Sequence, residues 1–131
     1  QMVDGGPLAE TDEFKRLIAE VEMDLETLSV TSLRQLANAS ADKPVGQEAS
    51  VLKMRTGDVF QRIHELMMMA GGYSIAPFLP EAIRGGWNEE PIGPDYLFRM
   101  APDYFEARAM SIAGGSHEVQ KNIIAKAMLG L

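Results

Sequence analysis

The sequence predicts an all-α fold of the up-and-down helical-bundle type. Apolar residues recur at steps of three and four along several long stretches, which is the period of a helix with one buried face. No stretch alternates between apolar and polar residues for long enough to predict a sheet. The chain has 131 residues, a length typical of one domain with its own hydrophobic core, so residues 1–131 are interpreted as a single domain.

The first predicted helix covers residues 10–38 and has one apolar stripe. Charged side chains fill the positions between the apolar ones, and we interpret them as a solvated helix face rather than as a metal site. The predicted members of the stripe are Phe14, Ile18, Val21, Leu25 and Leu28.

A second predicted helix covers residues 46–70, after a break at Asp42-Lys43-Pro44. The short joint predicts that the two long helices pack antiparallel. Gly57 lies inside this helix, where glycine costs on the order of 1 kcal/mol relative to alanine, so we expect another helix to approach closely there. The predicted apolar seam consists of Leu52, Val59, Ile63, Leu66 and Ala70.

Residues 71–95 are predicted to form one long loop, because glycine and proline are concentrated there. Three aromatic residues in or beside this stretch are expected to pin it to the bundle, namely Tyr73, Trp87 and Tyr96. A third helix is predicted over residues 102–112, with Pro102 in its first turn.

The last predicted helix covers residues 117–129 and follows an interruption at Gly114-Gly115-Ser116. Ser116 is its expected N-cap, because a serine hydroxyl oxygen can accept a hydrogen bond from a free backbone N–H of the first turn. The predicted apolar stripe of this helix consists of Val119, Ile123, Ala127 and Met128.

Composition and charge exclude several functional classes. The chain has no cysteine, which excludes a disulfide scaffold, a thiolate zinc site and a cysteine nucleophile. Its net charge of −7 makes nucleic acid and anionic membranes unfavourable partners. With no apolar run long enough to span a membrane and no signal-peptide pattern, we expect a cytoplasmic protein. His64 and His117 lie on different predicted helices without a partner at ligand spacing, so no metal site is predicted.

Two glycine pairs lie at predicted helix boundaries, and each allows two interpretations. Gly71-Gly72 follows the second helix, where glycine is a common C-cap, and Gly114-Gly115 precedes the last helix. Both pairs can act simply as helix punctuation. The free backbone N–H groups at the start of a helix also favour an anionic or polar ligand, which makes the second pair a candidate binding site.

Longer motifs resemble the acyl-CoA dehydrogenase family. Its C-terminal signature resembles the run Gly114-Gly115-Ser116-His117-Glu118-Val119-Gln120-Lys121-Asn122-Ile123-Ile124-Ala125-Lys126, which Leu129-Gly130-Leu131 follows. The family's preceding helix and its glycine pair are similar to Ala49-Ser50-Val51-Leu52-Lys53 and to Ala70-Gly71-Gly72-Tyr73, and Arg108-Ala109 fits as well. The resemblance is close over 46–73 and 108–131, looser over 10–40, and absent over 74–101.

This resemblance implies an FAD-dependent acyl-CoA dehydrogenase of fatty acid metabolism, which converts an acyl-CoA to a trans-2-enoyl-CoA and passes the electrons to an electron-transfer flavoprotein. The chain is similar only to the C-terminal helical bundle of such an enzyme and lacks the first helix of that bundle. We therefore expect it to be a piece of a longer flavoprotein, inactive by itself. The resemblance also implies a homo-oligomer, a dimer or tetramer, with this bundle at the interface and in part of the FAD site.

Residue by residue, the resemblance implies five cofactor contacts. Gly71 and Gly72 match the pair that approaches the FAD of a neighbouring subunit. Gly115, Ser116 and Glu118 match the positions at the FAD of their own subunit, where the family commonly has Thr or Ser followed two residues later by Gln or Glu.

Two positions depart from the family pattern. Met68 stands where the family often has a glutamine that contacts the cofactor, and a thioether makes no strong hydrogen bond. Gly114, preceded by Ala113, stands where one branch of the family has its catalytic glutamate, and other branches supply the base from a helix that this chain lacks. No catalytic residue is therefore assigned. Two alternatives stay open, an acyl-CoA oxidase and a non-catalytic helical interaction or scaffold member of the superfamily.

Overall fold

A computed structural model describes residues 2–3, 5–44, 46–77, 79–84, 86–90 and 93–130. Within these residues the chain is predominantly helical. The α-helices are α1 (Asp12–Ser40), α2 (Glu48–Gly71), α3 (Pro80–Ile83), α4 (Met100–Ala107) and α5 (His117–Leu129), and three short 3-10 helices cover Leu8–Glu10, Gly72–Ile75 and Arg108–Ser111. The described strands are two residues each, β1 (Met2–Val3) and β2 (Gly6–Pro7), which pair antiparallel with Met2 opposite Pro7.

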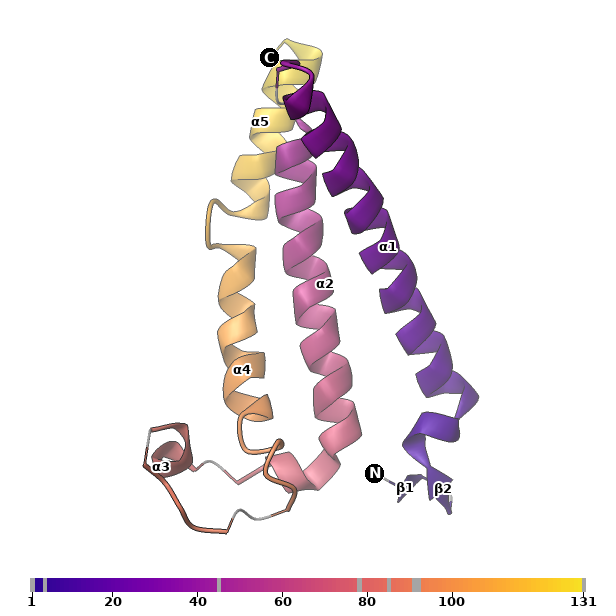
Figure 1. The fold of residues 1–131 in the computed structure, drawn as a ribbon, viewed down its shortest axis with the longest axis vertical. Coiled ribbons are helices and arrows are strands. Elements are labelled where there is room, and N and C mark those ends of the chain that lie inside the picture. The colour runs from indigo at the N-terminus through magenta and orange to yellow at the C-terminus, as the bar shows by residue number, and fades with distance from the viewer. Residues whose placement is uncertain are drawn as a thin grey trace.

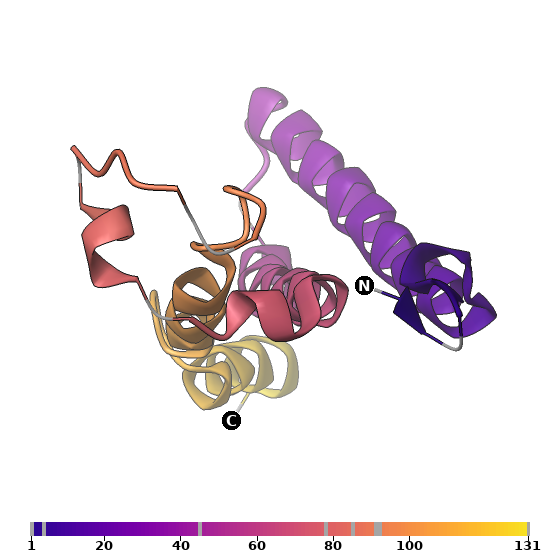
Figure 2. The same ribbon diagram turned by 90° about the horizontal axis from the view of Figure 1, so that it is seen from below.

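The central element of the fold is α2. It runs antiparallel to α1, while α4 and α5 follow one another along its other side (Figure 1). Viewed from below, α2 lies between α1 and the column formed by α4 and α5 (Figure 2). The all-α fold class predicted from helical periodicity is confirmed.

Local side-chain chemistry explains where α1 begins. The Thr11 hydroxyl accepts a hydrogen bond from the backbone N–H of Phe14 at 3.3 Å, and the same hydroxyl donates to the carbonyl of Leu8 at 2.8 Å. Thr11 is therefore the N-cap, and α1 starts two residues later than the expected position 10. Beyond Ser40, a turn at Asp42 with φ of 54° reverses the chain toward α2.

The hydrophobic core lies between α1 and α2. Its buried members are Phe14, Leu17, Val21, Val59 and Leu66, with Leu8, Leu28 and Ile63 packed against them. The predicted stripe on α1 was wrong at two positions, because Ile18 is 37% exposed and Leu25 is 44% exposed, whereas Leu17 is buried. One neighbouring helix covers only a narrow strip of α1, so the apolar positions beside that strip remain in solvent.

At Gly57, a buried residue of α2, the other side of this helix meets the segment between α4 and α5. A Cβ added at this glycine would lie 3.2 Å from the carbonyl oxygen of Met110 and 3.9 Å from Nε2 of His117. The same carbonyl accepts a hydrogen bond from Lys53 Nζ at 3.2 Å. The close approach predicted from a glycine inside this helix is confirmed.

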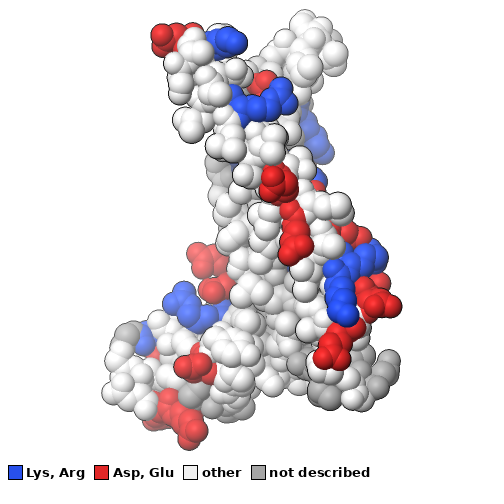
Figure 3. All heavy atoms as spheres, turned by 45° about the vertical axis from the view of Figure 1, so that its right-hand side comes forward, with Lys and Arg blue, Asp and Glu red and all other residues white. Residues whose placement is uncertain are grey.

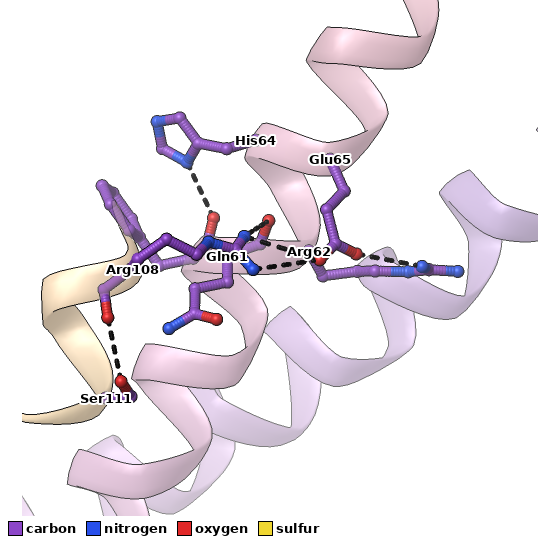
Figure 4. Close-up of polar contacts among 7 residues, drawn as sticks. Gln61, Arg62, His64, Glu65, Arg108 and Ser111 are labelled. Atoms are coloured by element: carbon purple, nitrogen blue, oxygen red, sulfur yellow. Dashed lines mark hydrogen bonds and ion pairs between the residues drawn. The ribbon is translucent and has the colours of Figure 1, made fainter. Parts of the chain in front are cut away.

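A polar cluster joins the second half of α2 to the end of α4 (Figure 4). The Arg108 guanidinium lies 4.5 Å from the ring centroid of Tyr104, and its Nη1 is 3.4 Å from Oε1 of Glu65. The other Glu65 oxygen accepts a hydrogen bond from Arg62 at 3.2 Å. The side chains of Arg108 and Glu65 are 40% and 37% exposed, so their ion pair contributes no more than about 1 kcal/mol to the free energy of unfolding. We interpret the pair as fixing the orientation of the two side chains rather than as a major source of stability.

The stretch from 71 to 95, predicted as one loop, contains a 3-10 turn at Gly72–Ile75 and the short helix α3. The predicted aromatic pins were wrong for two residues, since Tyr73 is 96% exposed and Tyr96 is 66% exposed. Buried Ile75 and Leu97 anchor this region instead, while the Trp87 ring lies 6.1 Å from the Phe98 ring.

The third and last helices also differ from the sequence interpretation. Pro102 lies in the first turn of α4, as predicted, but the helix begins two residues earlier, at Met100. The last turn of the predicted helix is the 3-10 helix Arg108–Ser111. In α5 the predicted apolar stripe was wrong, because every member of it is exposed and the buried residue is Gln120. The side of α5 that meets α2 carries Gln120, because that amide is needed by the preceding turn, as described below.

On the face drawn in Figure 3, acidic and basic side chains are intermixed rather than gathered in a patch of one sign. Among the exposed ion pairs of the molecule, Arg16 on α1 bonds both Glu13 and Glu20. The Arg16 guanidinium lowers the pKa of the Glu13 carboxyl, chiefly by hydrogen bonding to it. Among the described residues, the helices are too short or too polar for any of them to cross a membrane.

Candidate functional site

The first candidate site lies at the C-terminal end of α2. Gly72 caps the helix, with φ of 54° and ψ of −139°, and its N–H donates to the carbonyl of Met68. A Cβ at Gly71 would lie 2.4 Å from Cγ2 of Ile75 and 3.4 Å from Cδ2 of Leu97. Both glycines are thus required by the fold, Gly71 for packing and Gly72 for its backbone conformation. Their interpretation as helix punctuation is supported, and it does not conflict with a ligand beside them.

Two cavities open beside this glycine pair. One has a volume of about 460 Å³ and is lined by Ala70, Gly71, Gly72, Tyr73, Ser74, Pro94, Tyr96, Leu97 and Met100. The other has a volume of about 500 Å³ and is lined by Met68, Gly72, Tyr73, Ile75, Ala76, Ala101 and Phe105. The two cavities share Gly72 and Tyr73, and no charged side chain occurs among these lining residues. Their volumes fall within the range of small-molecule sites.

The second candidate site is the turn that leads into α5. Gly114 and Gly115 have φ of 71° and 102°, a region that residues with a Cβ rarely occupy. The buried Gln120 amide donates a hydrogen bond to the carbonyl of Gly114 at 3.0 Å. A Cβ at Gly115 would lie 2.7 Å from that amide nitrogen. The turn is therefore held by a side chain from the helix that follows it.

Ser116 and Glu118 complete this second site. Ser116 is the N-cap of α5, as predicted, because its Oγ accepts a hydrogen bond from the Val119 N–H at 3.4 Å. The pKa of the exposed Glu118 carboxyl is lowered, first by a hydrogen bond from the Ser116 hydroxyl and then by the backbone N–H of Glu118 itself. Glu118 therefore stays ionised at neutral pH and offers only hydrogen-bond acceptors.

The structure does not bring the two candidate sites together within one chain. The turn before α5 lies near Gly57, since His117 is beside that glycine. Gly71 lies 14 residues further along the same helix, a rise of about 21 Å. In Figure 1 the first turn of α5 and the far end of α2 are likewise well separated.

Sequence reasoning missed two residues of these sites. Gln120, four residues after the N-cap Ser116, holds the Gly114-Gly115 turn, and the sequence analysis included it only as part of a motif. Tyr73 lines both cavities with a ring that is almost fully exposed. Its position directly after the glycine pair was an available signal, but it was assigned to pinning the loop.

The two departures from the family pattern have clear places in the structure. Met68 lines the second cavity, so an apolar thioether stands there in place of an amide. Gly114 and Ala113 are both exposed, and neither provides a carboxylate. A separate hollow of about 280 Å³ between α2 and α4 is lined by His64, Asp103 and Glu106 together with apolar residues. It lies outside both glycine-bearing sites.

These features define a helical domain with two glycine-bearing surfaces, one at each of two helix boundaries. Comparison with known families identifies it further, because residues 2–129 match the family described as the acyl-CoA dehydrogenase, C-terminal domain. The chain therefore belongs to the acyl-CoA dehydrogenase family through this domain. A search of curated proteins found no matching relative.

Proposed function

We propose that this chain is the C-terminal helical domain of an FAD-dependent acyl-CoA dehydrogenase, which catalyses α,β-dehydrogenation of an acyl-CoA to a trans-2-enoyl-CoA. The observation that carries the proposal is the family match over residues 2–129. In this proposal FAD, when bound, supplies the acceptor for the two electrons removed from the substrate. The domain contributes part of the FAD site and part of a homo-oligomer interface, and an electron-transfer flavoprotein reoxidises the enzyme.

The end of α2 is compatible with an uncharged part of a nucleotide cofactor. Gly71 and Gly72 leave their backbone close to the cavity of about 460 Å³, and Ser74 adds a hydroxyl to its lining. In the proposal, these groups contact the FAD of a neighbouring subunit. Met68 cannot donate a hydrogen bond, so the contact made there is apolar.

The turn before α5 is compatible with a different part of the cofactor. The exposed Glu118 carboxyl has a lowered pKa, chiefly through hydrogen bonding with Ser116, so it places a negative charge at this turn. A diphosphate would meet a negative charge at this position, whereas ribose hydroxyls could donate to the same carboxylate. We therefore assign Ser116 and Glu118 to a hydroxyl-bearing part of the FAD of their own subunit, with Gly115 permitting its close approach.

The visible absorption spectrum of the full-length protein tests this proposal. We expect flavin bands in the purified protein, and we expect them to bleach when acyl-CoAs of one chain class are added under anaerobic conditions. The chain class that bleaches the flavin identifies the substrate. A flavin that no acyl-CoA bleaches would contradict the dehydrogenase proposal.

A second candidate function is a non-catalytic scaffold that has kept the bundle. Gly114 and Ala113 favour it, because neither supplies the carboxylate that one branch of the family places at this point. This candidate predicts a full-length protein that is colourless and free of flavin. The same spectrum therefore separates the two functions, and rapid reoxidation of bleached flavin in air would favour an oxidase instead.

A further inference from the structure

The first residue of α5, His117, lies against α2 with a ring nitrogen that makes no hydrogen bond. Its side chain is 24% exposed, and its Nε2 lies 3.9 Å from the position of a Cβ added at Gly57. Within the described residues, this nitrogen is shielded from solvent and has no hydrogen-bond partner in reach. A buried polar atom without a partner destabilises the folded state, so the charge of this ring affects how firmly α5 is held on α2.

An acidic side chain of α2 lies beside that nitrogen. Asp58 Oδ1 is 3.6 Å from His117 Nε2, which is slightly too far for a hydrogen bond but close enough for an ion pair. A neutral imidazole presents either a lone pair or an uncharged N–H to the carboxylate, whereas a protonated imidazole has an N–H on both nitrogens and a positive charge. Uptake of a proton therefore completes this contact between α2 and α5.

Asp58 also lies at the end of a row of charges that crosses the bundle. Arg55 on α2 pairs through Nη2 with Asp24 of α1 at 2.7 Å and through Nη1 with Asp58 at 3.6 Å. Because two carboxylates share one guanidinium, the row carries one unbalanced negative charge at the end that faces His117. A protonated His117 balances that charge and extends the row of ion pairs from α1 through α2 to α5.

The remaining charged groups near His117 act in both directions. On α5, Glu118 follows His117 and attracts a positive charge on its ring. Lys121 lies one turn further along the same helix and opposes such a charge, as does Lys53 of α2, whose ammonium group donates to a backbone carbonyl. Coulomb interactions weaken with distance, so we expect the Asp58 oxygen, which faces the ring nitrogen at 3.6 Å, to have the largest effect.

We propose that His117 forms a proton-dependent link between α2 and the first turn of α5. Imidazole is the side chain whose charge ordinarily changes between about pH 5 and 8. As the pH falls through this range, the ring pairs with Asp58 and holds the turn; as the pH rises, the pair is lost and the turn opens more readily. Ser116 and Glu118 flank His117, so the link regulates the rigidity of the second candidate site. The inference goes beyond the proposed function, because the link needs no cofactor.

Hydrogen exchange tests this link in the full-length protein, by mass spectrometry of a fragment that spans residues 115–125. Exchange rates at about pH 6 and about pH 8 are corrected for the intrinsic effect of pH, so that the protection of the backbone amides is compared. We expect protection to be about 2- to 5-fold higher at the lower pH, which is the range for a partly exposed ion pair. Asp58→Asn and His117→Gln should each give the same protection at both pH values.

His64→Gln is the matched control, because it replaces the other histidine of the chain, whose Nδ1 lies 2.8 Å from the carbonyl of Phe60. This variant should keep the pH dependence of the wild type. Equal wild-type protection at both pH values would overturn the inference, and this result needs no substitution. A pH dependence that survives in Asp58→Asn, or that disappears in His64→Gln, would overturn it as well. A protein free of flavin contradicts the proposed function and leaves this test unchanged.

Discussion

Truncation of a buried valine on α2 is a direct test of the core between α1 and α2. Val59 is 3% exposed and belongs to the cluster that includes Phe14 and Leu17. Val51 lies on the same helix but is 41% exposed. The two substitutions Val59→Ala and Val51→Ala remove the same atoms from the same helix, so the difference between them isolates burial.

The expected magnitude follows from the atoms removed. Each buried methyl group contributes about 0.8 kcal/mol, and the cavity left at Val59 adds about 1 kcal/mol. Alanine recovers about 0.5 kcal/mol through its higher helix propensity. We therefore expect Val59→Ala to lower the free energy of unfolding by about 2 kcal/mol and Val51→Ala to change it by less than about 0.5 kcal/mol.

Urea unfolding followed by far-ultraviolet circular dichroism measures both values. The slope of the free energy against urea concentration should be the same in wild type and variants, because the surface exposed on unfolding is nearly unchanged. Equal losses at the two positions would refute the reasoning, since they would show that Val59 is no more closely packed than Val51. A changed slope in Val59→Ala would indicate instead that α1 separates from α2 before the rest unfolds.

Two further predictions concern the turn before α5. Gly115→Ala should lower the free energy of unfolding by about 2 kcal/mol, because a left-handed φ is combined with crowding of the Gln120 amide. Gly130→Ala should lower it by only about 1 kcal/mol, because Gly130 has a φ of 69° but open space around it. Ser116→Ala should cost about 1 kcal/mol as a lost N-cap. It should also raise the pKa of Glu118 toward its ordinary 4.5, measured by NMR titration. Since the folded-state pKa of Glu118 is lowered, the stabilisation from its ionised carboxylate is present above the ordinary pKa and is lost as the pH falls through the folded-state pKa. A Glu118 pKa that is the same in wild type and Ser116→Ala would contradict the assignment of the lowered pKa to Ser116.

Much of the helical framework could be predicted from local patterns. The last helix was expected at 117–129, where the structure has α5, and its start was predictable because Ser116 is a strong N-cap signal. The start of α1 was displaced, because the Thr11 cap was not recognised as the boundary. Gly57 pointed correctly to a close approach, since a glycine inside a helix has few other reasons to be retained.

The buried faces were harder to predict than the helices. Ile18 and Leu25 share an apolar stripe with Phe14, and periodicity alone does not say which edge of a stripe meets the neighbouring helix. In α5 the buried residue is Gln120, because its amide satisfies the carbonyl of Gly114. A polar residue at an interior position has no signal in hydrophobic periodicity, so the stripe through Val119 was chosen instead.

By itself the sequence determined the all-α class, the family, the N-cap of α5 and the residue types at the two glycine-bearing surfaces. These depend on local chemistry, on period and on motif, which are properties of neighbouring residues. Only the tertiary structure decided that Gly71 packs against Ile75, that the two surfaces lie apart along α2, and that the Tyr73 ring stands free beside two uncharged cavities. Each of these depends on which distant side chains fill the space around a residue, and that arrangement is set by the packing of whole helices.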